Sequence, residues 1–204
     1  MYIPPAFKQD DLGRLHRIIR DYSFGLLVTV RDGVPFASHI PFLLDEDRGP
    51  SGTLVAHVAR PNPQWKGFGD GEALALFQGP HGYISPGWYQ SRSANVPTWN
   101  YAAVHAYGKV RIIDDAESVD RILARLTQTF ESGAAPWSVD ELDSQKHEAL
   151  RRGLVAFEMP IDRIEGKFKL SQNKSERDLS GAVGALRARG DAESVALADL
   201  MAAP

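Results

Sequence analysis

The sequence predicts a mainly β fold with helices, in which an antiparallel barrel is decorated by helices and ends in a helical pair. In the first hundred residues, apolar β-branched runs follow one another with short turns between them. A doubly wound sheet would need strands that alternate regularly with helices, and this part of the chain lacks that alternation. From Asp115 onward the apolar spacing changes to the spacing of helices.

The first elements expected are one helix and three strands. Apolar residues three and four apart predict a helix over residues 9–21: Leu12, Leu15, Ile18, Ile19 and Tyr22. Strands over residues 24–30, 34–44 and 53–58 follow, and we expect them to form a meander. Asp32 and Gly33 suit the positive φ angles of the tight hairpin turn between the first two strands.

The middle of the chain predicts a short helix and further strands. Asn62 is a good N-cap and Pro63 is preorganised for the first helical position. Strands are expected over residues 72–79, 82–85 and 101–113. Gly108, inside the last of these, indicates a bulge or a close approach of another backbone segment.

The last ninety residues combine helices with two more strands. The first helix starts at Asp115, with Asp114 or Asp115 as its cap, and its expected apolar face consists of Val119, Ile122, Leu123, Leu126 and Phe130. A short helix over residues 138–150 has Glu141 in capping-box position. Strands over residues 154–159 and 161–168 follow. Residues 171–173 are expected to end the last strand and to cap the first of two helices within residues 175–203.

Composition excludes several classes of function. The 204 residues contain no cysteine, which rules out disulfides, thiolate nucleophiles, iron–sulfur clusters and cysteine-ligated zinc. The formal net charge is −3, whereas a dedicated DNA-binding domain usually has a basic face. No apolar run approaches the roughly 20 residues of a membrane helix, and the first residues do not resemble a signal peptide. We therefore expect a cytoplasmic protein that does not enter a membrane.

Five segments carry a more specific signal, and their order and spacing hold over nearly the whole chain. They are LLVTVRDGVP (26–35) with SHIPF (38–42), HVARPNPQW (57–65), GPHGYISPGWY (79–89), VPTWNY (96–101) and KFKLSQN (167–173). Together they resemble the PaiB-type FMN-binding negative transcriptional regulators, within the pyridoxamine-phosphate-oxidase-like superfamily. The resemblance implies an antiparallel, Greek-key-like FMN-binding split β-barrel that works as a homodimer.

The same resemblance implies how the chain is divided. Residues 1–170 would form the FMN-binding split-barrel domain with N-terminal and inserted helices. Residues 171–204 would form a helical extension that packs on the barrel or on the partner subunit.

The FMN phosphate is a dianion that favours backbone N–H groups at a helix start and guanidinium donors. Arg60 and Asn62 precede the predicted helix at Pro63, and the resemblance places a phosphate contact there. The alternative is that Arg60 is a solvated loop arginine and that Asn62 is only a cap.

Other cofactor-binding candidates come from the same segments. Ser38 and His39 are neighbours on a strand, so they face opposite sides and at most one points at the flavin ring from the strand itself. His39 could equally be a strand histidine without a ligand. The resemblance adds the remaining candidates of these segments: Thr29, His57 and Trp65.

The later segments supply aromatic and basic candidates. Trp99 beside Asn100 would cover a flavin ring and its polar edge, although aromatic residues are more often found in cores or dimer interfaces. Lys167 and Lys169 share one face of a predicted strand. They would add positive charge near the phosphate or flavin N1, or they protect an exposed sheet edge.

Three functions are compatible with these residues. The resemblance implies a negative transcriptional regulator, with FMN and a DNA or protein partner, although the scattered basic residues make specific DNA binding unexpected. Bound FMN would also suit a flavin-dependent oxidoreductase of the pyridoxamine-phosphate-oxidase or flavin-reductase type. The third is a structural or interaction protein whose barrel has lost its cofactor. Some split-barrel relatives hold haem, with a histidine as axial ligand. The sequence indicates no catalytic residue and no metal site.

Overall fold

A computed structural model describes residues 1–203, which form two compact units built from segments far apart in the sequence. Unit 1 comprises Met1–Tyr22, Phe77–His105 and the chain from Glu165 onward. Unit 2 comprises Ser23–Leu76 and Ala106–Ile164. By compactness the C-terminal helices belong to unit 1, and the division of the chain at residue 170 stays a prediction.

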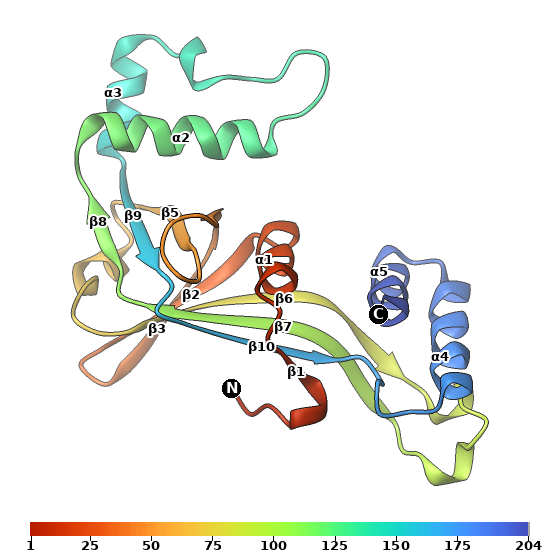
Figure 1. Ribbon diagram of the computed structural model, residues 1–204. Helices are drawn as coiled ribbons and strands as arrows, with labels where there is room; N and C mark the ends of the chain where they lie inside the picture. The colour runs from red at the N-terminus through yellow and green to blue at the C-terminus, as the bar shows by residue number, and fades with distance from the viewer. Residues whose placement is uncertain (204) are drawn as a thin grey trace. The chain divides into compact units, whose positions relative to one another are not determined.

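The described strands lie in two antiparallel sheets (Figure 1), which confirms the predicted fold class. The first sheet has the order β1-β10-β7-β6-β2-β3, with the bounds Lys8–Gln9, Arg163–Lys169, Thr98–Gly108, Ala73–Ile84, Phe24–Arg31 and Val34–Pro41. The second has the order β4-β5-β9-β8, with the bounds Leu43–Asp45, Thr53–Ala59, Leu154–Pro160 and Arg111–Ile113.

The hairpin of β2 and β3 in unit 2 has the predicted turn. Asp32 and Gly33 have φ angles of 53° and 76°, and they join the paired residues Arg31 and Val34. The single strand predicted over residues 34–44 is wrong, because Phe42 interrupts it. The Phe42 amide donates to the Ser23 carbonyl at 2.9 Å, and β3 and β4 on either side of it belong to different sheets. The predicted three-stranded meander therefore does not exist.

Two other strand boundaries also differ from the prediction. The strands expected over residues 72–79 and 82–85 are one strand, β6. The strand expected over residues 101–113 divides into β7, which already begins at Thr98, and β8. Gly108 ends β7, and a Cβ atom placed there would lie 2.0 Å from the carbonyl oxygen of Pro160. The predicted close backbone approach at Gly108 is confirmed.

Helices cover the second sheet in unit 2. Asp115 caps α2 (Ala116–Phe130), as predicted. The apolar side of α2 packs on β4, β5 and β9 in a core formed by Leu43, Val55, Val119, Ile122, Leu123, Leu126, Leu154 and Ala156 (Figure 1). Phe130, the last residue of α2, is 54% exposed and lies outside this core.

The helix predicted over residues 138–150 is two elements. The capping box of Ser138 and Glu141 is present, but it starts only the 3₁₀ turn η5 (Val139–Glu141). A second cap at Asp143 then begins α3 (Ser144–Arg152). The other short 3₁₀ turns are η1 (Pro5–Phe7), η2 (Pro63–Gly67), η3 (Pro86–Trp88) and η4 (Arg92–Ala94).

Unit 1 contains the remaining helices. Helix α1 (Leu12–Asp21) begins three residues later than predicted, because Lys8 and Gln9 pair with β10 and Asp11 provides the cap. The predicted C-terminal pair, α4 (Glu176–Arg189) and α5 (Ala192–Ala202), is confirmed, with Gly190 at φ 74° between them. Ser175 caps α4, so residues 171–173 do not have the predicted capping role. Across residues 1–203, the helices are all too short or too polar for a membrane span.

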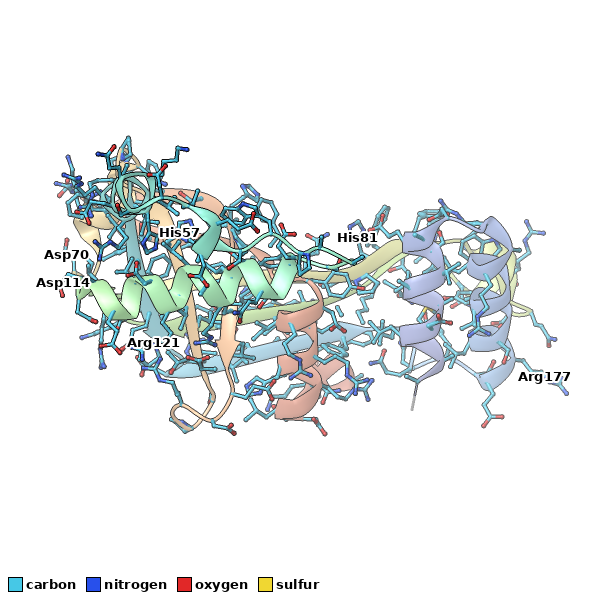
Figure 2. All side chains as sticks on the ribbon, turned by 90° about the horizontal axis from the view of Figure 1, so that it is seen from above. His57, Asp70, His81, Asp114, Arg121 and Arg177 are labelled. Carbon is cyan, nitrogen blue, oxygen red and sulfur yellow. The ribbon has the colours of Figure 1, made fainter. Side chains whose placement is uncertain are left out.

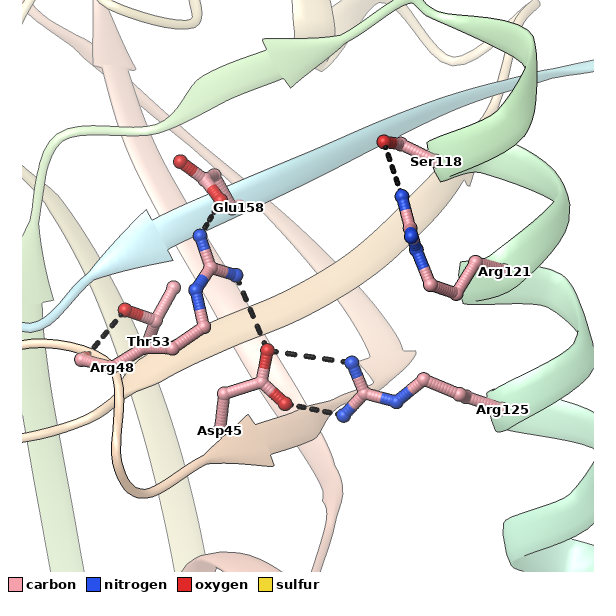
Figure 3. A network of polar contacts seen from close by, with 7 residues as sticks. All are labelled: Asp45, Arg48, Thr53, Ser118, Arg121, Arg125 and Glu158. Atoms are coloured by element: carbon pink, nitrogen blue, oxygen red, sulfur yellow. Dashed lines mark hydrogen bonds and ion pairs between the residues drawn. The ribbon is translucent and has the colours of Figure 1, made fainter.

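An ionic network joins α2 to the strands beneath it (Figure 3). Asp45 accepts from Arg125 and, at 3.2 Å, from Arg48, whose other terminal nitrogen lies 2.6 Å from Glu158. Burial raises the pKa of the Asp45 carboxyl, but the hydrogen bonds and charges of Arg125 and Arg48 outweigh burial and hold that pKa below its ordinary value. This network stabilises the attachment of α2 to the second sheet.

Candidate functional site

The predicted site residues fall into one group in each unit. Unit 2 holds Thr29, Ser38, His39, His57, Arg60, Asn62 and Trp65, and unit 1 holds Trp99, Asn100, Lys167 and Lys169.

In unit 2, four polar side chains form what we call the η2 cluster: Thr29, Ser38, Asn62 and Gln64. Asn62 caps η2 as predicted by accepting from the Gln64 amide at 3.0 Å, and its own amide donates to Ser38 Oγ at 2.9 Å. The Gln64 side-chain amide donates to the Leu27 carbonyl at 3.0 Å and lies 3.2 Å from Thr29 Oγ1.

Gln64 was not among the residues predicted from the sequence. Its side chain is only 4% exposed, and its oxygen Oε1 has no hydrogen-bond partner among residues 1–203. Buried polar atoms are normally satisfied, so an unpartnered buried carbonyl is a position where a ligand could donate a hydrogen bond. The only sequence signal was its place directly after the predicted helix start.

The η2 cluster lies against β2 and β3 of the first sheet, where Gln64 contacts the Leu27 and Phe36 carbonyls. β3 is the last strand of that sheet over residues 1–203, so within this part of the chain one side of its backbone has no neighbouring strand. Ser38 points to the cluster, whereas His39 packs its ring on Phe24 at 6.1 Å between centroids. The structure therefore brings Ser38, and not His39, together with Asn62.

Arg60 and Trp65 line a cavity of about 330 Å³, which we call the Arg60 pocket. Arg60 donates from Nε to the Arg152 carbonyl and from Nη2 to the Leu154 carbonyl, both at 2.7 Å. Arg151 and Arg152 also line the pocket, together with the acidic residues Asp114 and Glu148. The Trp65 indole donates to the Arg60 carbonyl at 2.9 Å and fixes the turn.

His57 lies on β5 at the start of the same segment (Figure 2). Its Nδ1 has no hydrogen-bond partner within the described chain. Burial lowers the pKa of the imidazole, so the ring is neutral at pH 7.

In unit 1, Asn100 and Lys169 line a separate cavity of about 230 Å³, the Lys169 pocket. Trp99 and Lys167 do not line it. The Trp99 indole donates to His81 Nδ1 at 3.2 Å. Lys167 is 8% exposed, and its ammonium group donates to the Tyr2 carbonyl at 3.0 Å.

Residues 1–163 match the family model described as "Putative FMN-binding domain". The chain belongs to this FMN-binding family. It is 34% identical to the Bacillus subtilis protein "Protease synthase and sporulation protein PAI 2" over 98% of this chain and 96% of that protein. An uncharacterised protein of Emericella nidulans is 30% identical over 98% of this chain and 96% of its own length. The predicted PaiB-type family is confirmed.

Two solved structures share the fold of this FMN-binding chain. The FAD and haem binding protein of Mycobacterium smegmatis has a TM-score of 0.61 at 20% identity, covering 85% of this chain and 78% of that one. The flavocytochrome Anf3 of Azotobacter vinelandii has the same TM-score at 14% identity, covering 85% and 75%. With the sheet topology, these likenesses confirm the predicted split-barrel architecture.

Family membership supports a flavin cofactor, and the residues of unit 2 fit one chemically. A flavin mononucleotide brings a phosphate dianion, ribityl hydroxyls and a ring edge with donors and acceptors. The Arg60 pocket offers the guanidinium group of Arg60 for the phosphate, since those of Arg151 and Arg152 already pair with Glu148. The η2 cluster offers hydroxyl and amide groups and the unpartnered Gln64 oxygen.

Proposed function

We propose that this chain binds FMN in unit 2, at the η2 cluster, the edge of β3 and the Arg60 pocket. The observation that carries the proposal is the buried, unpartnered oxygen of Gln64 beside an open strand edge. A hydroxyl or ring N–H of the flavin would satisfy it. All these residues lie inside the segment that matches the FMN-binding family.

In this proposal the Arg60 pocket holds the phosphate. Arg60 has two donors occupied by carbonyl groups, which fixes the plane of its guanidinium group, and the remaining N–H groups are donors for a phosphate oxygen. Ser38 and Asn62 hold and orient the rest of the cofactor. Bound FMN supplies reversible two-electron transfer, while the chain's own residues bind and orient it. Lys167 is left out of the flavin site because it belongs to unit 1 and is only 8% exposed.

Arg60→Ala is expected to weaken FMN binding by about 1.5–3 kcal/mol, the scale of hydrogen bonds to a charged group. Riboflavin, which has no phosphate, should bind the variant nearly as well as the wild type. Arg121→Ala is the matched control, because Arg121 lies on α2 in the same unit, outside the Arg60 pocket, and its side chain is 59% exposed (Figure 2). Fluorescence titrations with both ligands measure the effect. Equal losses for FMN and riboflavin would show that Arg60 acts only through the fold.

The absorbance spectrum of the purified protein distinguishes the proposed cofactor from haem. The solved M. smegmatis relative is described as binding both FAD and haem, and His57 offers a neutral, unpartnered imidazole nitrogen for haem. We expect flavin bands and no Soret band. If the wild type shows a Soret band and His57→Ala does not, the cofactor is haem held by His57, and the FMN proposal is wrong.

We also propose that the protein is a homodimer that uses the β2–β3 hairpin. Four large apolar side chains on this open-edged hairpin are between 40% and 68% exposed: Phe24, Val30, Val34 and Phe36. A second copy of the chain would bury them, and twofold dimers are the commonest oligomers. Light scattering should give twice the mass of one chain, and Phe36→Asp should give monomers. A monomeric wild type at micromolar concentration would refute the dimer.

A role in negative regulation of transcription is proposed from the PaiB-type resemblance, without direct DNA binding. Basic residues at the C-terminal end of α4 are already paired, Arg187 with Asp199 at 2.8 Å and Arg189 with Asp191 at 3.4 Å. We expect no sequence-specific binding tighter than about 100 nM in gel shifts near physiological salt. Specific binding in that range would point to a basic surface made by the dimer.

Reduction of bound FMN by NADPH at a catalytic rate would instead favour an oxidoreductase.

A further inference from the structure

The Lys169 pocket in unit 1 has a positively charged lining. Lys169 and Lys174 line it, and the part of the chain that the structure describes contributes no aspartate or glutamate to its lining. Lys169 donates to Thr98 Oγ1 and, at 2.9 Å, to the Trp99 carbonyl. Lys174 donates to Asn95 Oδ1 at 2.6 Å. Neither ammonium group has an anionic partner in these contacts, so the pocket carries two positive charges that only neutral groups solvate.

The surroundings of Lys169 agree with this charge balance. Burial lowers the pKa of its ammonium group, and the positive charges of Lys167 and Lys174 lower it further. An anion in the pocket would offset both effects.

Asn100 adds a second and independent sign of a ligand. It is 1% exposed, and its amide donates to Ser171 Oγ at 2.8 Å. Its oxygen Oδ1 is buried and has no hydrogen-bond partner within residues 1–203. The neighbouring Ser171 has a φ angle of 65°, which is rare for a residue with a side chain and is found mostly where the surrounding structure enforces it. An unpartnered carbonyl oxygen requires a donor, so the ligand needs a hydroxyl or N–H group as well as a negative charge.

We propose that the Lys169 pocket binds a small hydroxylated anion, either a sugar phosphate or a hydroxycarboxylate. The ammonium groups of Lys169 and Lys174 would bind the anion, and Asn100 Oδ1 would accept from the hydroxyl group. The cavity of about 230 Å³ lies below the usual size of a site for a larger cofactor, about 300–1,000 Å³.

This pocket shares no residue with the FMN site proposed above. All of its lining residues belong to unit 1, whereas the residues proposed for FMN belong to unit 2. Its two lysines lie beyond residue 163, where the match to the FMN-binding family ends, and Asn100 lies within that match. The proposal of a small-anion ligand therefore does not depend on the flavin proposal.

Calorimetric titration of the full-length protein with ribose 5-phosphate and with L-malate tests the proposal. We expect at least one of them to bind the wild type with Kd below about 1 mM. Lys174→Met, which keeps the length of the side chain and removes its charge, should weaken that binding at least about tenfold, and Asn100→Asp should weaken it further by placing a carboxylate beside the anion. Arg177→Met is the control, because Arg177 is exposed on α4, points outward and does not line the pocket (Figure 2).

Thermal unfolding of each variant shows whether it folds. If Asn100→Asp does not fold, Lys174→Met alone decides the outcome. The proposal is overturned if neither probe binds the wild type, or if Arg177→Met weakens binding as much as Lys174→Met.

FMN and riboflavin titrations distinguish a separate anion site from a site for the flavin phosphate. We expect Lys174→Met to leave both unchanged. If Lys174→Met loses affinity for FMN but not for riboflavin, the pocket binds the flavin phosphate, and the proposal of a separate ligand is overturned.

Discussion

Gly108→Ala is expected to destabilise the protein by about 3 kcal/mol or more, the upper range for overpacking. The new Cβ would lie 2.0 Å from the Pro160 carbonyl oxygen and 3.2 Å from Met159 Cγ. The first of these atoms is main chain, so no side-chain rotation relieves the contact, and the ends of β7 and β9 would have to separate. Chemical denaturation measures the loss.

Gly184→Ala is the matched control for this substitution. Gly184 lies inside α4, and a Cβ placed there meets no atom within 4 Å. Alanine has the higher helix propensity, so the protein should become more stable by about 0.5–1 kcal/mol. A Gly108→Ala variant as stable as the wild type would mean that the two strand ends do not approach each other as described.

Asp45→Asn should lower the free energy of unfolding at pH 7 by about 2–3 kcal/mol, because it removes the charge shared by Arg125 and Arg48 in Figure 3. The Asp45 side chain is 13% exposed, so water replaces the lost interaction poorly. Asp10→Asn is the control, since the Asp10 side chain is 72% exposed and pairs with Lys8 at the surface. Its loss should stay below about 1 kcal/mol.

The pH dependence gives an independent check on the Asp45 network. The pKa of Asp45 is lower in the folded protein than its ordinary value, so the ionised carboxylate favours the folded state. This contribution is fully present above the ordinary carboxyl pKa, about 3.9. It is lost as the pH falls through the lower folded pKa, where wild type and Asp45→Asn should converge in stability. A constant difference between them down to pH 2 would contradict this assignment.

The sequence predicted the kinds of elements better than the points where the chain changes direction. The turn at Asp32 and Gly33 and the caps at Asn62 and Asp115 were predicted correctly, because each depends on residues adjacent in sequence. The break at Phe42 was missed, because an apolar residue inside an apolar run gives no local signal. Only the two sheets on either side of it distinguish β3 from β4.

The candidate site shows the same limit. The family signatures indicate which segments hold candidate site residues, but partners across the fold decide what each side chain in them does. Arg60 looked like a solvated loop residue or a phosphate ligand, and its contacts with the Arg152 and Leu154 carbonyls come from residues more than ninety positions later. Gln64 and Lys174 were not predicted as site residues, because an amide or an ammonium group indicates a site only when its neighbours in the fold are known.

The place of β10 in the first sheet has a consequence for the synthesis of the chain on the ribosome. β10 (Arg163–Lys169) lies between β1, formed by residues 8 and 9, and β7. Until β10 has emerged, β1 lacks the strand with which it pairs and the β10 side of β7 stays open. Open strand edges pair readily with other chains, and long-range strand pairing is slow. We therefore expect nascent chains to be prone to aggregation before β10 is made, and the yield of folded protein to depend on chaperones.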